Sequence, residues 1–340
     1  MAPHLDREGG RPIAPTPTPT PTPTHGQALD APTQQQQPPA NATVLRAASL
    51  SPTVRALVLK LDDADADGDE GDPFLDYKAG QWVDLSCDGF PGVGGFSMCA
   101  PPSGADFRRR RELELAVKRS RHPPAAWAHD PERCKPGARV RVRAGGSFTL
   151  GLADAAGCDA ALFLAGGIGV TALAAMAGEL SERWQRGAQG AGGGGAGNDG
   201  GGGGGGPRRA AVLYSARRRE GLVLLPPLRR WAAAAPGGRL RLQLHVTGDE
   251  RPLPADGREE AWRRGRMSAA EALAAVDALA LSLAPAASSS ATGGGGGRAR
   301  PPPSVGVFVC GPPQMTDELA AAVAEHPLVG KARVFTEKWW

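Results

Sequence analysis

The chain has 340 residues, a formal net charge of +4, and a high content of glycine and proline, with 48 and 32 residues. Its length suits two ordinary domains, and the excess of glycine and proline indicates that part of it does not pack into a core. Basic residues are scattered and partly matched by acids, which argues against a nucleic-acid partner, and no apolar run reaches the ~20 residues of a membrane span.

The five cysteines lie far apart in the sequence and include no C-x-x-C pair. This spacing is unlike that of a disulfide framework, a zinc site or an iron–sulfur cluster, so we expect free thiols, no metal site and a reducing intracellular compartment. The N-terminal segment lacks the compact apolar core of a secretory signal and is a poor mitochondrial or plastid presequence. A presequence missing from this sequence stays open.

The first residues are of low complexity, with alternating Pro and Thr at 15–24 and a Gln run at 34–37. We predict a disordered tail over residues 1–41. From residue 42 to residue 152, short segments that alternate apolar and polar residues are separated by Gly and Pro clusters, which is typical of an antiparallel barrel or sandwich. The strands expected there are 54–61, 81–87, 96–99, 112–118 and 139–144.

From residue 153 onward, strands alternate with helices, which predicts a parallel sheet with helices on both faces. Ser268 and Glu271 have the spacing of a capping box at the start of one helix, and another helix is expected from residue 316 to residue 324. Two tracts, 187–206 and 285–303, are too rich in Gly, Ala, Ser and Pro to pack, so we expect flexible insertions. The expected strands are 161–165, 210–215, 239–246, 305–310 and 332–336.

The predicted fold class is therefore α+β with two domains. An antiparallel β-barrel over 42–152 precedes an α/β domain with a parallel sheet over 153–340.

The most informative stretch follows the first parallel strand, where an apolar run meets the glycine cluster Gly166-Gly167-Ile168-Gly169 and then a helical pattern. Glycines let the backbone of such a turn approach a ligand closely, and the helix N-terminus offers N–H groups to a phosphate. The stretch predicts a nucleotide whose diphosphate lies on the turn. A glycine-rich turn in some other α/β domain is the alternative, because the loose G-x-G-x-x-A pattern is a weak signal by itself.

Two motifs, well separated and in a fixed order, carry a family resemblance. The turn from Gly166 to Thr171 reads G-G-x-G-x-T, with Ala172 where a proline is usual, and the segment from Cys310 to Met315 reads C-G-P-x-x-M. Together they resemble the ferredoxin–NADP reductase superfamily, in which an FAD-binding FR-type barrel precedes an NAD-binding domain. Segments 94–99, 115–118, 122–127 and 337–340 look closest to the oxidoreductase NAD-binding domain-containing proteins.

The resemblance implies an FAD site on the barrel. Phe96, Ser97 and Met98 are the implied flavin-binding residues, and Ser97 stands at the catalytic position that hydrogen-bonds the flavin N5 region. Gly94 replaces the family's arginine that pairs with the flavin phosphate, and a lost charge-assisted hydrogen bond costs about 1.5–3 kcal/mol. The family's second flavin element, a glycine–serine turn, is replaced by segment 122–127. The candidates to supply the missing charge are Lys118, Arg119 and Arg121.

The resemblance also implies an NAD(P)H site. Cys310 falls at the catalytic position beside the nicotinamide C4, and Gly311 and Pro312 shape its turn. Ser215 and Arg217 lie where the family contacts the adenosine ribose; they favour NADPH, with NADH left open. The implied contacts of the diphosphate are Gly166, Gly167, Gly169, Val170 and Thr171. The terminal Trp340 is placed either near the flavin ring or in an aromatic pair that seals the domain interface.

The implied function is a flavin-dependent oxidoreductase that passes hydride from NADH or NADPH to FAD and on to an acceptor. No ferredoxin-like or haem domain is fused, so the acceptor is expected to be a small molecule or a separate protein. The alternative is a non-catalytic dinucleotide-binding module that has lost efficient flavin binding. The resemblance raises the mitochondrion as a compartment, which the N-terminus does not support.

Overall fold

An antiparallel sheet of six strands forms the first half of the chain. Its order is β4-β3-β6-β1-β2-β5, and its alternating apolar residues, such as Leu57, Leu59 and Val83, fill one buried core. The strands are β1 (Ala40–Ser51), β2 (Val54–Leu61), β3 (Trp82–Cys87), β4 (Gly94–Ser97), β5 (Glu112–Lys118) and β6 (Arg139–Gly145). The strand pattern predicted for this half is confirmed, with β1 added, whose sequence lacks a regular alternation.

The predicted barrel is only partly closed. The two edge strands of the sheet, β4 and β5, are linked by an isolated bridge between Met98 and Leu115 and by a hydrogen bond from the Cys99 amide to the Glu114 carbonyl, 2.8 Å long. Because β4 has only four residues, the chain just beyond it makes the closing contact. The sheet therefore curls towards closure without a continuous ladder between its edges.

A parallel sheet of six strands forms the second half, in the order β10-β9-β8-β7-β11-β12. Its central strands are buried along their whole length, as expected for a sheet covered on both faces. The edge strand β10 was not predicted, because its sequence E-A-W-R-R is charged and only Trp262 is buried. The strands are β7 (Ala160–Gly166), β8 (Arg209–Ala216), β9 (Leu240–Val246), β10 (Glu260–Arg264), β11 (Val305–Gly311) and β12 (Val334–Lys338).

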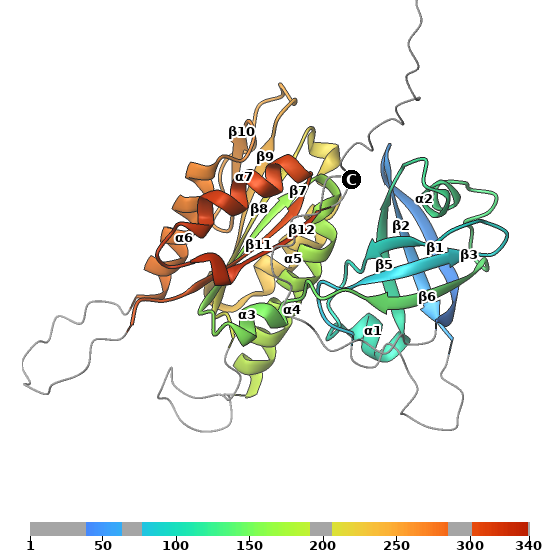
Figure 1. Cartoon of the computed structure of the whole chain (residues 1–340), viewed down its shortest axis with the longest axis horizontal. Coiled ribbons are helices and arrows are strands. Elements are labelled where there is room, and N and C mark those ends of the chain that lie inside the picture. The colour runs from blue at the N-terminus through green and yellow to red at the C-terminus, as the bar shows by residue number, and fades with distance from the viewer. Residues whose placement is uncertain (1–38, 63–76, 191–205, 285–300, 339–340) are drawn as a thin grey trace, which may run out of the picture. The chain divides into compact units, whose positions relative to one another are not determined.

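Helices cover both faces of the parallel sheet, as predicted (Figure 1). On β7, Phe163 faces the core shared with α4 (Val170–Gly190) and α5 (Leu225–Ala234), while Leu162 faces α6 (Ala269–Leu283) and α7 (Pro313–Ala324). Ser268 caps α6 in the predicted capping box with Glu271. Helix α4 continues to Gly190, within the segment predicted as an insertion. No helix in the described part of the chain is long and apolar enough to cross a bilayer.

The computed structural model describes residues 39–62, 77–190, 206–284 and 301–338, all within one compact unit, Gln37–Trp340. Nearly all of the predicted tail, most of both insertions and Trp340 lie outside these residues. Short helices α1 (Ala105–Arg110), α2 (Pro123–Ala128) and α3 (Gly151–Ala155) complete the elements. The predicted domain boundary, between residues 152 and 153, falls inside α3 and stays a prediction.

One carboxylate, Asp159, joins the starts of three strands of the parallel sheet. Its side chain accepts hydrogen bonds from the Ser304 amide at 3.0 Å and from Arg208 Nη2 at 2.9 Å. Its backbone amide donates to the Ser304 carbonyl, and its carbonyl accepts from the Arg208 amide. Asp159 thereby holds the residues that precede β8 and β11 next to the start of β7.

Candidate functional site

The predicted phosphate turn lies at the carboxyl end of β7, where a 3-10 turn over Gly167–Gly169 leads directly into α4. Gly167 has φ +54°, a left-handed conformation that favours glycine, and open space surrounds the position of its absent side chain. The Thr171 hydroxyl donates to the Ile168 carbonyl at 2.9 Å and so stabilises the turn. This geometry matches the strand, tight turn and helix expected from the sequence.

The two sequence motifs meet in space. Strands β7 and β11 are parallel neighbours, with Ala165 opposite Cys310. A Cβ on Gly169 would lie 2.3 Å from the Cys310 carbonyl oxygen. A Cβ on Gly166 would lie 2.7 Å from Met315 Sδ. Gly169 is therefore required by the close approach of the β11 backbone, whereas a Cβ on Gly166 would meet side-chain atoms. The Cys310 side chain is buried beside the turn.

The end of β8, where contacts with the adenosine ribose are predicted, lies next to the phosphate turn. Ser215 is opposite Gly166 in the ladder of β7 and β8, and Arg217 follows as an exposed residue. In parallel sheets, ligands bind outside the carboxyl ends of the strands at the point where the strand order reverses. The chain leaves β7 for β8 on one side and reaches β11 on the other, so Gly166, Ser215 and Cys310 lie at such a point.

The nearby acid Asp249 is already neutralised. It is 6% exposed and accepts hydrogen bonds from the Arg219 amide and from the amide and guanidinium of Arg251. The Arg251 side chain, followed by these backbone amides, holds the pKa of Asp249 well below its usual value. Asp249 thus brings no unpaired negative charge to the nucleotide end of the sheet.

The predicted flavin residues Phe96 and Ser97 line a cavity of about 610 Å³. Ile168 and Thr171 of the phosphate turn also line it, so the cavity lies beside that turn. The Ser97 hydroxyl is buried and has no hydrogen-bond partner among the described residues. Buried polar atoms are almost always paired, so an orphaned hydroxyl at a cavity wall indicates a ligand or water contact.

Other predicted site residues lie elsewhere. Met98 is 1% exposed and belongs to the core of the antiparallel sheet. Cys310, Ser215 and Arg217 are not among the residues that line the cavity of Ser97.

The electropositive wall of this cavity comes from the connection between β5 and α2. Lys118, Arg119 and His122 line it, and its lining contains no Asp or Glu. The ring of His129, just beyond α2, donates from Nε2 to the Val117 carbonyl at 2.9 Å, which holds the helix against β5. Arg121, also a candidate from the sequence, is exposed and is not among the lining residues.

One contact between the first and second halves of the chain was not visible in the sequence. The Ser103 amide donates to Glu179 Oε2 of α4 at 3.2 Å, and Glu179 also accepts from Arg183. Glu179 is only 7% exposed, and its charge is a secondary cause, after burial, of the raised pKa of Tyr77. Glu179 and Ser103 are far apart in the sequence, and neither belongs to a motif, so no local signal pointed to the pair.

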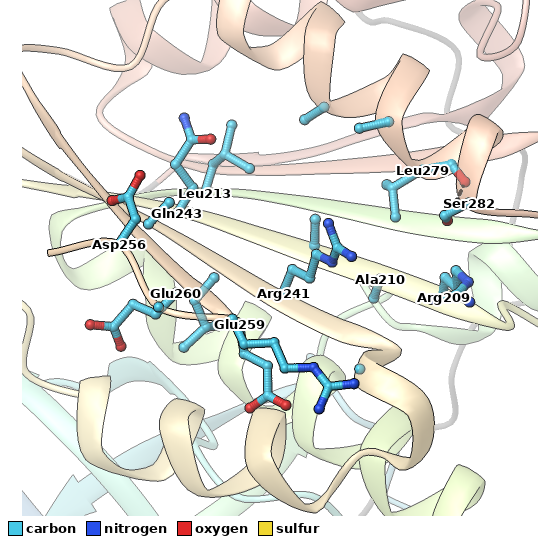
Figure 2. Close-up of a pocket in the computed structure, with 18 of the residues that line it drawn as sticks. Arg209, Ala210, Leu213, Arg241, Gln243, Asp256, Glu259, Glu260, Leu279 and Ser282 are labelled. Atoms are coloured by element: carbon cyan, nitrogen blue, oxygen red, sulfur yellow. Dashed lines mark hydrogen bonds between the residues drawn. The ribbon is translucent and has the colours of Figure 1, made fainter.

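A second cavity, of about 470 Å³, lies between α6 and strands β8 to β10. Figure 2 shows Leu279 and Ser282 of α6 on one wall and Arg209 and Arg241 on the strand side. This cavity follows mainly the amino-terminal halves of β8 and β9, away from the strand ends that carry the motifs. It is therefore separate from the predicted nucleotide site.

Comparisons with known proteins support the sequence resemblance. No family model matches the chain. The human protein named Oxidoreductase NAD-binding domain-containing protein 1 is 39% identical over 132 residues, which cover 39% of this chain and 38% of that protein. The chain thus matches about two-fifths of the length of this relative.

Solved structures of reductases share the fold. Flavohemoglobin from Malassezia yamatoensis, with bound FAD and heme, has a TM-score of 0.57 at 16% identity and covers 90% of this chain and 62% of its own. A ferredoxin NADP+ reductase from Neisseria gonorrhoeae, with bound FAD and NADP, has a TM-score of 0.54 at 12% identity and covers 89% and 99%. The predicted two-domain fold is confirmed, and these reductases share it.

Proposed function

Because the chain has the fold of ferredoxin–NADP reductases and resembles oxidoreductase NAD-binding domain-containing protein 1, we propose that it is a flavin-dependent NAD(P)H oxidoreductase. The observation that carries the proposal is the cavity that Ser97, whose buried hydroxyl has no partner in the described structure, lines together with Phe96 and with Thr171 of the phosphate turn. Bound FAD would accept a hydride from NAD(P)H and pass the electrons to an acceptor, a small molecule or a separate protein.

The residues of the cavity fit a flavin. A volume of about 610 Å³ lies within the range of sites for small organic ligands, roughly 300–1,000 Å³. Phe96 offers an aromatic face to a flat ring, and the Ser97 hydroxyl offers a donor that satisfies no other group in the described structure. We assign Ser97 to orienting the ring through a hydrogen bond and Phe96 to packing on it.

The residues at the carboxyl ends of β7, β8 and β11 fit a nicotinamide dinucleotide. The proposed diphosphate contact is the turn from Gly166 to Thr171, whose glycine backbone leaves room for close approach. Cys310, small and buried beside that turn, would leave room for the nicotinamide ring. Arg217, an exposed cation at the end of β8, would favour the 2′-phosphate of NADPH.

Absorbance spectroscopy of the purified full-length protein tests this function. We expect flavin bands, either as isolated or after addition of FAD and removal of the excess. Under anaerobic conditions, NADPH or NADH is expected to bleach these bands, and the faster donor identifies the preferred nucleotide. Protein that stays colourless after incubation with FAD would refute the enzyme assignment.

A second candidate function follows from position 94, where the family's arginine is absent. The alternative is a non-catalytic module that binds a nicotinamide dinucleotide without retaining a flavin. This module would change the fluorescence of NADPH on binding but would show neither flavin bands nor NADPH oxidation with added FAD. The same preparation therefore distinguishes the two functions.

A further inference from the structure

Position 94 has no room for a phosphate-binding side chain in this structure. A Cβ on Gly94 would lie 2.7 Å from Cε2 and 2.9 Å from Cζ of Phe96, and 3.0 Å from Cβ of Pro124. Pro124 is buried at the start of α2, and Phe96 is packed against the core of the antiparallel sheet. A longer side chain at residue 94 would displace the aromatic ring that faces the cavity. The charge for an anionic ligand must therefore come from another wall.

An excess of positive charge is found at the end of β5. Lys118 and Arg119 line the cavity, and neither side chain forms a salt bridge within the described residues. Their backbone is fixed: Lys118 is opposite Val54 in the ladder of β2 and β5, and the Arg119 amide donates to the Thr53 carbonyl at 2.8 Å. Two adjacent cations at a cavity that lacks acidic lining residues attract an anion, and no salt bridge to another described residue neutralises them.

We propose that Lys118 and Arg119 together bind the diphosphate of the flavin dinucleotide and replace the charge that residue 94 cannot carry. This inference rests on the proposed function and assigns the anchor of that same site. The shared chemistry is a nucleotide diphosphate, and FAD is the source favoured here because Phe96 and Ser97 line the same cavity. Ser97 holds the ring end of the ligand, and the two cations hold its charged end.

The exposure of both side chains gives this anchor a distinctive property. Lys118 and Arg119 are exposed, so their attraction for phosphate is screened by salt, with a Debye length of about 10 Å at 0.1 M and 3 Å at 1 M. Affinity for FAD should therefore fall as salt rises, whereas affinity for riboflavin, which has no phosphate, should not. A buried, hydrogen-bonded arginine would be much less sensitive to salt.

The test is a set of binding titrations with FAD, riboflavin and NADPH, followed by flavin or nucleotide fluorescence at low and high salt. The variant is Lys118→Gln/Arg119→Gln, and Arg121→Gln is the matched control, because Arg121 is an exposed cation in the same connection that does not line the cavity. A Lys118→Arg variant, which keeps the charge, is expected to bind FAD like the wild type. Thermal unfolding of each variant checks that these exposed substitutions leave the fold intact.

For the double variant we expect FAD binding at least about tenfold weaker, the effect of losing one or more charge-assisted hydrogen bonds, and little remaining salt dependence. Riboflavin binding and the Arg121→Gln control should be unchanged. Equal losses for FAD and riboflavin, or no loss for FAD, would overturn the assignment. A loss confined to NADPH would overturn it too, because the cations would then serve the nicotinamide nucleotide. Wild-type protein that binds neither FAD nor riboflavin refutes the proposed function itself.

Discussion

The contact between the phosphate turn and β11 makes Gly169 the most sensitive position in the nucleotide site. In a Gly169→Ala variant, the new Cβ would lie 2.3 Å from the oxygen and 2.5 Å from the carbon of the Cys310 carbonyl, and 2.7 Å from the Gly311 nitrogen. All three atoms belong to the backbone of a central strand, so no side chain can rotate away. The turn must move by about 0.7 Å or more before the closest contact reaches 3.0 Å.

Such overpacking typically costs about 1–3 kcal/mol, and a domain of 150–250 residues loses roughly 2–4 °C of Tm per kcal/mol. We expect Gly169→Ala to lower Tm accordingly and to weaken NADPH binding at least about tenfold, because the turn shifts relative to Cys310. Thermal unfolding and NADPH fluorescence titrations measure the two effects.

The matched control is Gly187→Ala, late in α4, where the new Cβ would have no atom within 4 Å apart from its own helix. Alanine there should stabilise the helix by up to about 1 kcal/mol. If Gly169→Ala had the Tm and the NADPH affinity of the wild type, the close packing of the turn on β11 would be refuted.

Two further predictions concern single polar groups. Ser97→Ala should leave the free energy of unfolding unchanged or higher, since the hydroxyl has no partner in the described structure, while flavin reduction by NADPH slows by about tenfold in stopped-flow absorbance; a large loss of stability would contradict this. Burial opposes the charge of Asp159, but hydrogen bonds from Ser304 and Arg208 outweigh it and lower its pKa below 3.8. The stability that these bonds add is present above pH 3.8 and is lost as the pH falls below it. The difference in unfolding free energy between wild type and Asp159→Asn should therefore shrink between about pH 6 and about pH 3, and a constant difference would exclude the carboxylate's charge as its cause.

Local patterns predicted the parts of the fold that are governed by local rules. Strand β2 occupies the predicted residues, and Ser268 caps α6 as its spacing with Glu271 required. The glycine turn was also predictable, because a buried strand, clustered glycines and an amphipathic helix are adjacent in the sequence. Strand β10 was not predictable, since an edge strand with one buried residue has no alternation to detect.

The space and the charge in the flavin cavity depend on contacts between segments that are not adjacent in the sequence. The missing arginine at Gly94 is visible in the sequence, but the reason that nothing larger fits there is the position of the Phe96 ring against Pro124. The choice between Lys118, Arg119 and Arg121 also required the structure, because only the first two line the cavity. Composition and spacing cannot separate three cations that lie within four positions of the sequence.

The hydrogen bonds of Asp159 also bear on how this chain tolerates changes in length. The chain returns to the parallel sheet at Arg208 after one glycine-rich tract and at Ser304 after the other, and both returns are held by the same carboxylate. In general, doubling the length of a connection costs only about 0.6 kcal/mol in closure entropy. Genetic expansion or contraction of either tract should therefore be nearly neutral for folding, and both tracts are suitable places to insert a reporter domain or an affinity tag.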